Sequence, residues 1–293
     1  METLTGRAIV ALLAAFTTGQ VLYAAPSCTN ADLNGVYGML ATGAIIVAPG
    51  FPPPFLGPFA RAGRVYADGK GNISVANTAS YNGTIIPESY SGTYTVNSDC
   101  SVDIRPVVGL PIGPGGALIP VPFEFIGALA DNGNSAAVVL CGLGPGVPCF
   151  PNPQPTGNVI RVLLSRYGVN RAACTNRDLA GDFLVDMSGT VVSGSPLSGP
   201  FARDGRLVFD GLGGFNGHAV TVLAGFIIQA EDISGSYSVD SLCNISISFT
   251  ASTAHTWVGT LSNAGNGADL IVADSGVVIT GTLEKQKPGQ GPE

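Results

Sequence analysis

The sequence predicts an all-β protein that folds into two tandem antiparallel meander β-barrels, each of about seven to eight strands. The first observation is an internal repeat, in which residues 28–35 recur as 174–181 and residues 57–64 recur as 199–206. The second is an alternation of apolar and polar residues with a period of two, as at 244–249. The third is the high glycine content, 41 of 293 residues, with Asn and Asp between the apolar runs. A β-sandwich is the alternative arrangement of the same strands.

Residues 1–25 have the composition of a secretory signal peptide. Arg7 precedes the apolar run 8–16, and we expect cleavage near Ala24 or Ala25. The apolar run is shorter than the roughly 20 residues that a membrane-spanning helix needs. We therefore expect a secreted or periplasmic protein with no stable membrane insertion. An outer-membrane barrel is the competing interpretation, and the polar C-terminal segment argues against it because it does not resemble a final membrane strand.

The repeat divides the rest of the chain into two units. We expect a first barrel at 26–168, a second barrel at 169–285 and a disordered tail at 286–293. Copies of roughly 110 to 140 residues suit independent domains better than solenoid units. The first copy carries two additional proline-rich segments, 49–55 and 141–155, which we place between strands because proline cannot donate a ladder hydrogen bond.

Turn signals occur at equivalent places in both copies. Asp68-Gly69 and Asp210-Gly211 predict hairpin turns, because glycine accepts the positive φ that tight turns need. A short helical turn at 30–33 is the exception to the β pattern. Closing such a meander into a barrel removes its exposed edge strands.

Six cysteines are present, and disulfides are their expected state outside the cytoplasm. Requiring the same pairing in both copies, and then pairing the remaining two, favours these bonds: Cys28–Cys100, Cys174–Cys243 and Cys141–Cys149. No two cysteines have the spacing of a zinc site, and no histidine lies near them in the sequence. The sequence therefore predicts no metal and no cofactor.

The repeated motifs also resemble a known group of proteins. In order they are Cys-x-Asn-x-x-Leu-x-Gly, Phe-Ala-Arg-x-Gly-Arg, Asp-Gly-x-Gly, Gly-[Thr/Ser]-Tyr-[Thr/Ser]-Val and a final Cys. This pattern resembles uncharacterised secreted bacterial proteins with a single copy, and more remotely it is similar to small calycin-type or allene-oxide-cyclase-like barrels. The resemblance covers nearly the whole mature chain and implies the barrel fold. No catalytic motif of the cyclases matches, so none of their residues is carried over.

Each copy has one arginine and one glutamate at strand positions that alternation predicts to face the barrel interior. They are Arg61 and Glu88 in the first copy, and Arg203 and Glu231 in the second. A lone buried charge is costly, whereas a hydrogen-bonded pair is tolerated. We therefore expect the pairs Arg61–Glu88 and Arg203–Glu231 inside the barrels. The alternative to a binding role is a structural ion pair that fixes strand register.

The second copy also contains His255 and Trp257, where the first has Phe123 and Phe125. If that strand is continuous, His255 and Trp257 face the interior and form a polar pocket in the second barrel. Imidazole titrates near neutral pH, which suits general acid–base chemistry. A hydrogen-bonded core or rim histidine is the alternative. The candidate catalytic residues are then Arg203, Glu231 and His255, and the same residues with Trp257, Arg61 and Glu88 are the candidate binding residues.

Composition and motifs exclude several functions. Acidic residues outnumber basic ones by 20 to 13, which disfavours nucleic-acid binding. No serine-hydrolase elbow, zincin motif or phosphate-binding loop occurs. We expect a binding or structural module, with a small apolar ligand in a barrel, and we favour a non-enzymatic role. The alternative is an isomerase or cyclase that acts on an apolar small molecule in the second barrel. The sequence predicts neither the identity of the ligand nor the oligomeric state.

Overall fold

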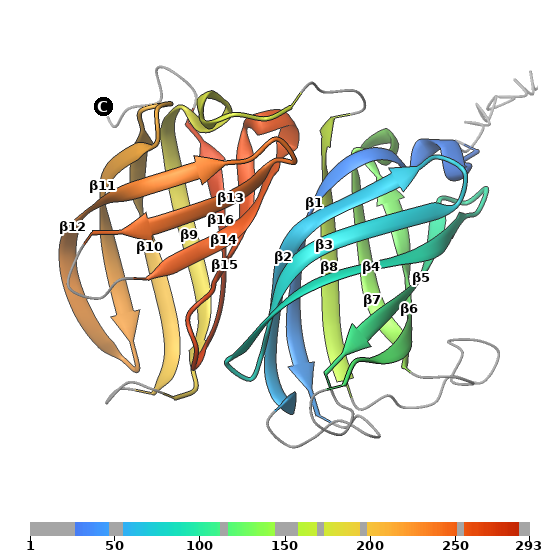
Figure 1. The fold of residues 1–293 in the computed structure, drawn as a ribbon, viewed down its shortest axis with the longest axis horizontal. Helices are drawn as coiled ribbons and strands as arrows, with labels where there is room; N and C mark the ends of the chain where they lie inside the picture. The colour runs from blue at the N-terminus through green and yellow to red at the C-terminus, as the bar shows by residue number, and fades with distance from the viewer. Residues whose placement is uncertain are drawn as a thin grey trace, which may run out of the picture.

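The computed structural model describes residues 27–46, 55–111, 117–143, 158–168, 173–193, 198–250 and 255–286, except for the side chains of residues 228–231. The two barrels that these residues form lie side by side (Figure 1). The expected signal peptide and nearly all of the expected tail lie outside the described residues.

Each half of the chain forms one closed barrel of eight antiparallel strands, and the predicted fold class is confirmed. Sequence neighbours pair throughout, and the last strand of each barrel returns to the first. The first barrel consists of β1 (Asn34–Ile45), β2 (Gly57–Asp68), β3 (Asn72–Tyr81), β4 (Thr84–Val96), β5 (Ser101–Leu110), β6 (Ile119–Ala130), β7 (Ser135–Leu143) and β8 (Asn158–Gly168). The second consists of β9 (Gly181–Val191), β10 (Gly199–Phe209), β11 (Gly214–Leu223), β12 (Phe226–Val239), β13 (Asn244–Phe249), β14 (Thr256–Ser262), β15 (Gly267–Val272) and β16 (Val277–Lys285).

The repeated motif at the start of each copy closes one end of its barrel. It forms the short 3₁₀ helices η1 (Asn30–Asp32) and η5 (Asn176–Leu179). In η1, the backbone N–H of Thr29 donates to the Asp32 carboxylate at 2.8 Å, as expected of a capping box. Leu33, which follows η1, is buried in the core of the barrel.

An asparagine in the same motif ties this end of the barrel to β4 or β12. The Asn30 Oδ1 accepts a hydrogen bond from the Val96 N–H at 2.7 Å, and the Asn176 Oδ1 accepts one from the Val239 N–H at 2.7 Å. The same contact therefore forms in both copies. The conserved spacing within the repeat reflects a structural requirement, since these residues close the barrel.

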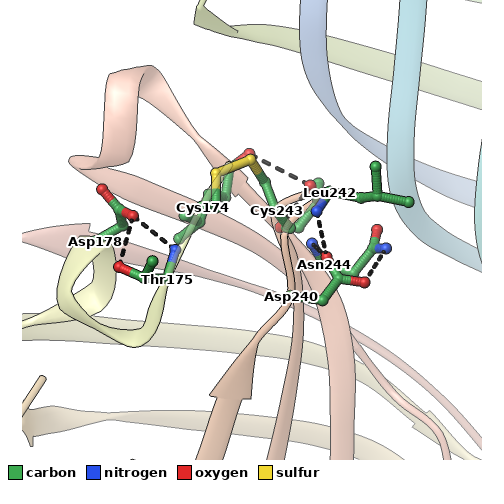
Figure 2. Close-up of a disulfide and its surroundings, with 9 residues drawn as sticks. Cys174, Thr175, Asp178, Asp240, Leu242, Cys243 and Asn244 are labelled. Carbon is green, nitrogen blue, oxygen red and sulfur yellow. Dashed lines mark hydrogen bonds between the residues drawn. A yellow bond between two sulfur atoms is a disulfide. The ribbon is translucent and has the colours of Figure 1, made fainter. Parts of the chain in front are cut away.

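Two predicted disulfides are confirmed, Cys28–Cys100 and Cys174–Cys243. Each joins the segment before the 3₁₀ helix to the turn that follows β4 or β12. Figure 2 shows the second bond beside the capping pair Thr175 and Asp178. Cys149 lies outside the described residues, so the Cys141–Cys149 pairing stays a prediction.

The outer faces of β1–β3 pack against those of β14–β16, so the barrels touch. Ala60 and Ala62 on β2 contact Ile271 and Val278 in a shared apolar cluster. Two hydrogen bonds also cross the interface, from the Ser80 hydroxyl to the Val277 carbonyl at 2.7 Å and from the Gly276 N–H to the Gly83 carbonyl at 2.9 Å. Small side chains on β2 permit this close approach of the two sheets.

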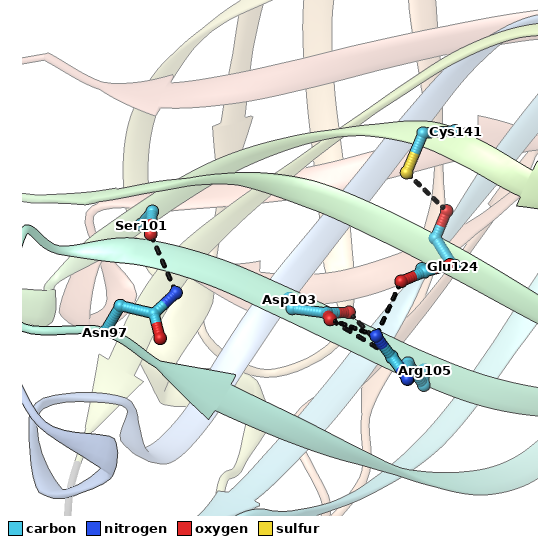
Figure 3. Close-up of polar contacts among 6 residues, drawn as sticks. All are labelled: Asn97, Ser101, Asp103, Arg105, Glu124 and Cys141. Carbon is cyan, nitrogen blue, oxygen red and sulfur yellow. Dashed lines mark hydrogen bonds and ion pairs between the residues drawn. The ribbon is translucent and has the colours of Figure 1, made fainter. Parts of the chain in front are cut away.

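A charged group on the outer surface of the first barrel joins β5 to β6. The Arg105 guanidinium lies 2.7 Å from the carboxylates of Asp103 and Glu124 (Figure 3). The arginine side chain is 60% exposed, so water screens these ion pairs and each contributes under about 1 kcal/mol. These exposed ion pairs can be compared with the buried ion pair described below. Within the described ranges, no helix has the length and apolarity that crossing a membrane would need.

Candidate functional site

The interior of the first barrel contains a buried ion pair between β2 and β4. Arg61 and Glu88 are each the fifth residue of their strand, counted from the same end of the barrel. Their charged groups are 2.7 Å apart, and the side chains are 5% and 2% exposed. The contact expected from strand parity therefore forms in the first barrel.

Neighbouring polar groups complete the bonding of this pair. The Glu88 carboxylate accepts hydrogen bonds from the Tyr81 hydroxyl at 2.6 Å and from the Asn77 amide at 2.8 Å. The Arg61 guanidinium donates to the Tyr81 hydroxyl at 2.9 Å and to the Tyr90 hydroxyl at 3.1 Å. Both carboxylate oxygens are thus occupied, as a buried charge requires.

Burial and charge shift the pKa values of the group in ways that keep its protonation fixed. Burial alone would lower the pKa of Arg61, but Glu88, Tyr90 and Tyr81 together more than offset this and the pKa is raised. Burial raises the pKa of Tyr90 to about 12 and the pKa of Tyr81 well above 10. Near neutral pH both tyrosines therefore keep their protons, while the arginine carries its charge.

A small apolar cavity of about 40 Å³ lies next to the pair. Its wall consists of ten apolar residues together with Arg61 and Tyr90. Valines contribute much of this wall, among them Val75, Val138 and Val162. The volume exceeds the roughly 10–15 Å³ that one water needs, and it is far below the roughly 300 Å³ of pockets for drug-sized ligands.

One polar atom of a residue that lines this cavity has no partner. The Arg61 Nε is buried, and among the described residues none accepts a hydrogen bond from it. A buried donor without an acceptor costs about 1–3 kcal/mol. Most buried polar groups in proteins are paired, so this exception calls for an explanation.

The strand ladder between β4 and β5 ends beside the cavity. The last pair in this direction is Ser91 with Val107, whereas β4 continues to Thr84 along β3. Pro106, which lacks an N–H, lies next to this point and lines the cavity with Tyr90. Beyond this pair, β4 and β5 therefore form no further ladder pairs beside the cavity.

The second barrel satisfies the equivalent arginine differently. The Arg203 Nε donates to the Thr221 hydroxyl at 2.7 Å, and both residues are buried. Thr221 faces Arg203 across the β10–β11 ladder as Ala79 faces Arg61 across the β2–β3 ladder. The Glu231 side chain lies outside the described residues, so the Arg203–Glu231 pair stays a prediction.

Aromatic rings fill the interior of the second barrel. The rings in mutual contact, with centroids between 4.5 and 5.6 Å apart, are Phe183, Phe209, Phe215, Tyr237, Phe249 and Trp257. Rings therefore surround Trp257 where a polar pocket was expected. The first barrel also contains buried rings, among them Phe59, Phe123 and Phe125. Trp257 is 1% exposed and belongs to the core.

His255 was expected to face the barrel interior on condition that one continuous strand runs from Phe249 to Trp257. That condition is not met, because β13 ends at Phe249 and β14 begins at Thr256. The imidazole Nδ1 lies 2.6 Å from the Asp274 carboxylate, and the histidine side chain is 40% exposed. The residue thus occupies a rim position, which was the alternative interpretation.

Three residues of the site were missed from the sequence: Asn77, Tyr81 and Tyr90. All three face inward by strand parity, and the signal lay in the differences between the copies. Tyr81 has Leu223 as its counterpart in the ladder, because each is the partner of the first phenylalanine of β2 or β10. An inward-facing position that is apolar in one copy and polar in the other, next to a buried charge, indicates a hydrogen-bond partner of that charge.

No known family model matches this chain, and no curated protein matches it either. Among solved structures, the chain is similar to a protein of unknown function from the DUF3598 family of Nostoc punctiforme PCC 73102. The identity is 10%, the TM-score is 0.25, and the match covers 87% of this chain and 97% of that chain. A TM-score this low assigns neither fold nor function, so the barrel architecture rests on the strand pairing of the chain itself. The resemblance to calycin-type or cyclase-like barrels stays a prediction.

Proposed function

We propose that the protein is an extracytoplasmic binding module whose first barrel holds a small, mainly apolar molecule. The observation that carries the proposal is the cavity of about 40 Å³, which combines an apolar wall with Arg61 and Tyr90. Binding sites for small molecules commonly combine an apolar lining with a few fixed polar groups. The second barrel, with its interior filled by rings, serves as a rigid support.

Location outside the cytoplasm is supported by the disulfides. Two of them close loops of 72 and 69 residues, and none of the described cysteines is free. Such bonds persist in oxidising compartments and are rare where thiols are kept reduced. The composition of residues 1–25 agrees with export.

Binding without turnover fits the chemistry of the pair. A general base needs a free lone pair within reach of the substrate proton. Both oxygens of Glu88 accept hydrogen bonds, from the tyrosine and the amide, and Glu88 is not among the residues that line the cavity. The pair is therefore suited to orienting a ligand inside the barrel.

The proposal is tested by filling the cavity. Val138 lines it and is 2% exposed, whereas its neighbour Val139 on β7 faces outward and is 49% exposed. Small apolar compounds should shift the methyl NMR signals of wild type and of the control Val139→Phe, but not those of Val138→Phe. In wild type, the shifts should concentrate on the valines of the cavity wall.

Equal binding by both variants would overturn the proposal, as would shifts located in the second barrel or no binding by any compound. Circular dichroism establishes that each variant keeps its β-sheet content. If Val138→Phe does not fold, the location of the shifts in wild type decides the question.

A further inference from the structure

We infer that the ligand of the first barrel is an uncharged molecule with an acceptor oxygen, which takes a hydrogen bond from the Arg61 Nε. This inference rests on the proposed function, because it assigns chemistry to the molecule that the cavity holds. It excludes both pure hydrocarbons and carboxylates as the preferred ligand class.

The unpartnered donor supplies the first argument. Arg61 is 4% exposed, forms part of the cavity wall, and uses its two terminal nitrogens for Glu88 and the tyrosines. Its Nε has no acceptor among the described residues. A ligand that brings an acceptor removes the cost of that buried donor, whereas a hydrocarbon leaves it in place.

The second barrel shows that an acceptor fits at this atom. There the Thr221 hydroxyl accepts from the Arg203 Nε at 2.7 Å. In the first barrel the facing residue is Ala79, whose methyl group cannot accept a hydrogen bond. The two barrels therefore differ in whether the protein itself occupies the donor, and the first leaves it for another molecule.

Tyr90 provides a second donor for the same oxygen. Its hydroxyl accepts from Arg61 at 3.1 Å, and it also lines the cavity. Burial raises the pKa of Tyr90 to about 12, so the hydroxyl proton is present near neutral pH. A carbonyl oxygen has two lone pairs and can accept from two donors at once.

The charge balance of the site argues for a neutral ligand. The Arg61 charge is already matched by Glu88 at 2.7 Å, and the rest of the wall is apolar apart from Tyr90. A carboxylate would therefore bring a second negative charge with no remaining counter-charge. Burying an unpaired ion costs far more than burying a neutral acceptor.

Three probes of nearly equal shape separate these possibilities: 2-butanone, 2-methyl-1-butene and propanoate. The alkene replaces the carbonyl oxygen with a CH₂ group, and propanoate replaces one methyl group with a charged oxygen. Titration of the full-length, disulfide-bonded protein by methyl NMR gives a dissociation constant for each. We expect 2-butanone to bind on the order of tenfold more tightly than the alkene, because it alone satisfies the donor. Propanoate should bind more weakly than 2-butanone.

Two matched variants locate the effect. Ala79→Thr places in the first barrel the hydroxyl that the second barrel already has, and it should abolish the preference for 2-butanone over the alkene. Thr221→Ala makes the reverse change in the second barrel and should leave the preference unchanged.

Each possible result of the titrations has one interpretation. If none of the probes binds, the proposed function fails. If the alkene binds as tightly as 2-butanone, the cavity binds ligands but the inferred hydrogen bond is absent. If propanoate binds most tightly, the charge argument is wrong. The comparison in wild type decides these cases even if Ala79→Thr does not fold.

Discussion

Asp269 is a buried carboxyl group between the barrels, and replacing it with asparagine should stabilise the protein in a pH-dependent manner. It lies on β15, is 8% exposed, and faces Gly38 of β1 so closely that a Cβ on that glycine would lie 2.6 Å from its Oδ2. Burial raises its pKa from 3.8 to about 7, partly offset by a hydrogen bond from Ser262. The folded protein therefore holds this proton to a higher pH than the unfolded chain does.

The sign and size of the effect follow from linkage. The stability that the bound proton contributes is complete below pH 4, and it is lost as the pH rises through 7. The two pKa values, 3.8 and about 7, differ by about 3. At about 1.4 kcal/mol for each pH unit, wild type loses about 4 kcal/mol over this range.

The asparagine variant has no such proton to lose. The free energy of unfolding of Asp269→Asn should therefore match that of wild type within about 1 kcal/mol at pH 4. At pH 8 it should exceed that of wild type by about 4 kcal/mol. Urea unfolding at the two pH values measures the difference, because Trp257, the single tryptophan of the chain, reports on the second barrel. Glu284→Gln is the control, since this exposed residue of β16 already lies in water. A difference between variant and wild type that does not change with pH would show that Asp269 does not hold a proton in the folded protein near neutral pH.

Three further changes test other contacts. Glu88→Gln should lower the free energy of unfolding by about 3–5 kcal/mol, because it leaves the buried guanidinium without a counter-charge. Glu124→Gln at the exposed pair should lower it by under about 1 kcal/mol. Equal losses in urea unfolding would show that the Arg61–Glu88 pair is not buried. Replacing Cys28 and Cys100 with serine opens a loop of 72 residues and should cost about 4 kcal/mol on the chain-entropy model, and an unchanged melting temperature would show that the bond does not constrain the unfolded chain. Gly38→Ala should lower the free energy of unfolding by about 1–3 kcal/mol, because the added methyl group clashes at the barrel interface. It should also increase the radius of gyration measured by X-ray scattering. Full stability together with an unchanged radius would show that the interface is loose.

The barrel architecture was predictable because its signals are local and occur twice. Strand alternation and turn residues such as Asp68-Gly69 are readable without knowledge of distant contacts. The duplicated motif then constrained the cysteines, because the same bond had to form in both copies. Parity also placed Arg61 and Glu88 inside the barrel, where burial requires that they pair.

The remaining features depend on contacts that alternation does not encode. His255 lies between the end of β13 and the start of β14, so its orientation depended on where these two strands end and begin. The docking of the barrels depends on the shapes of two outer faces, and a strand with alanines at 60 and 62 reads from its sequence as an ordinary exposed face. The cavity depends on how side chains from most of the strands fill a closed space, which the sequence pattern of single strands does not encode.

The hydrogen bond between a ligand and the Arg61 Nε can be observed in a crystal structure of the protein soaked with 2-butanone. We expect density for the ketone inside the first barrel, with its oxygen at about 3 Å from the Arg61 Nε, which is hydrogen-bond distance. A ketone bound in the second barrel or between the barrels, or a first barrel that does not admit it, would show that the first barrel is not the binding site.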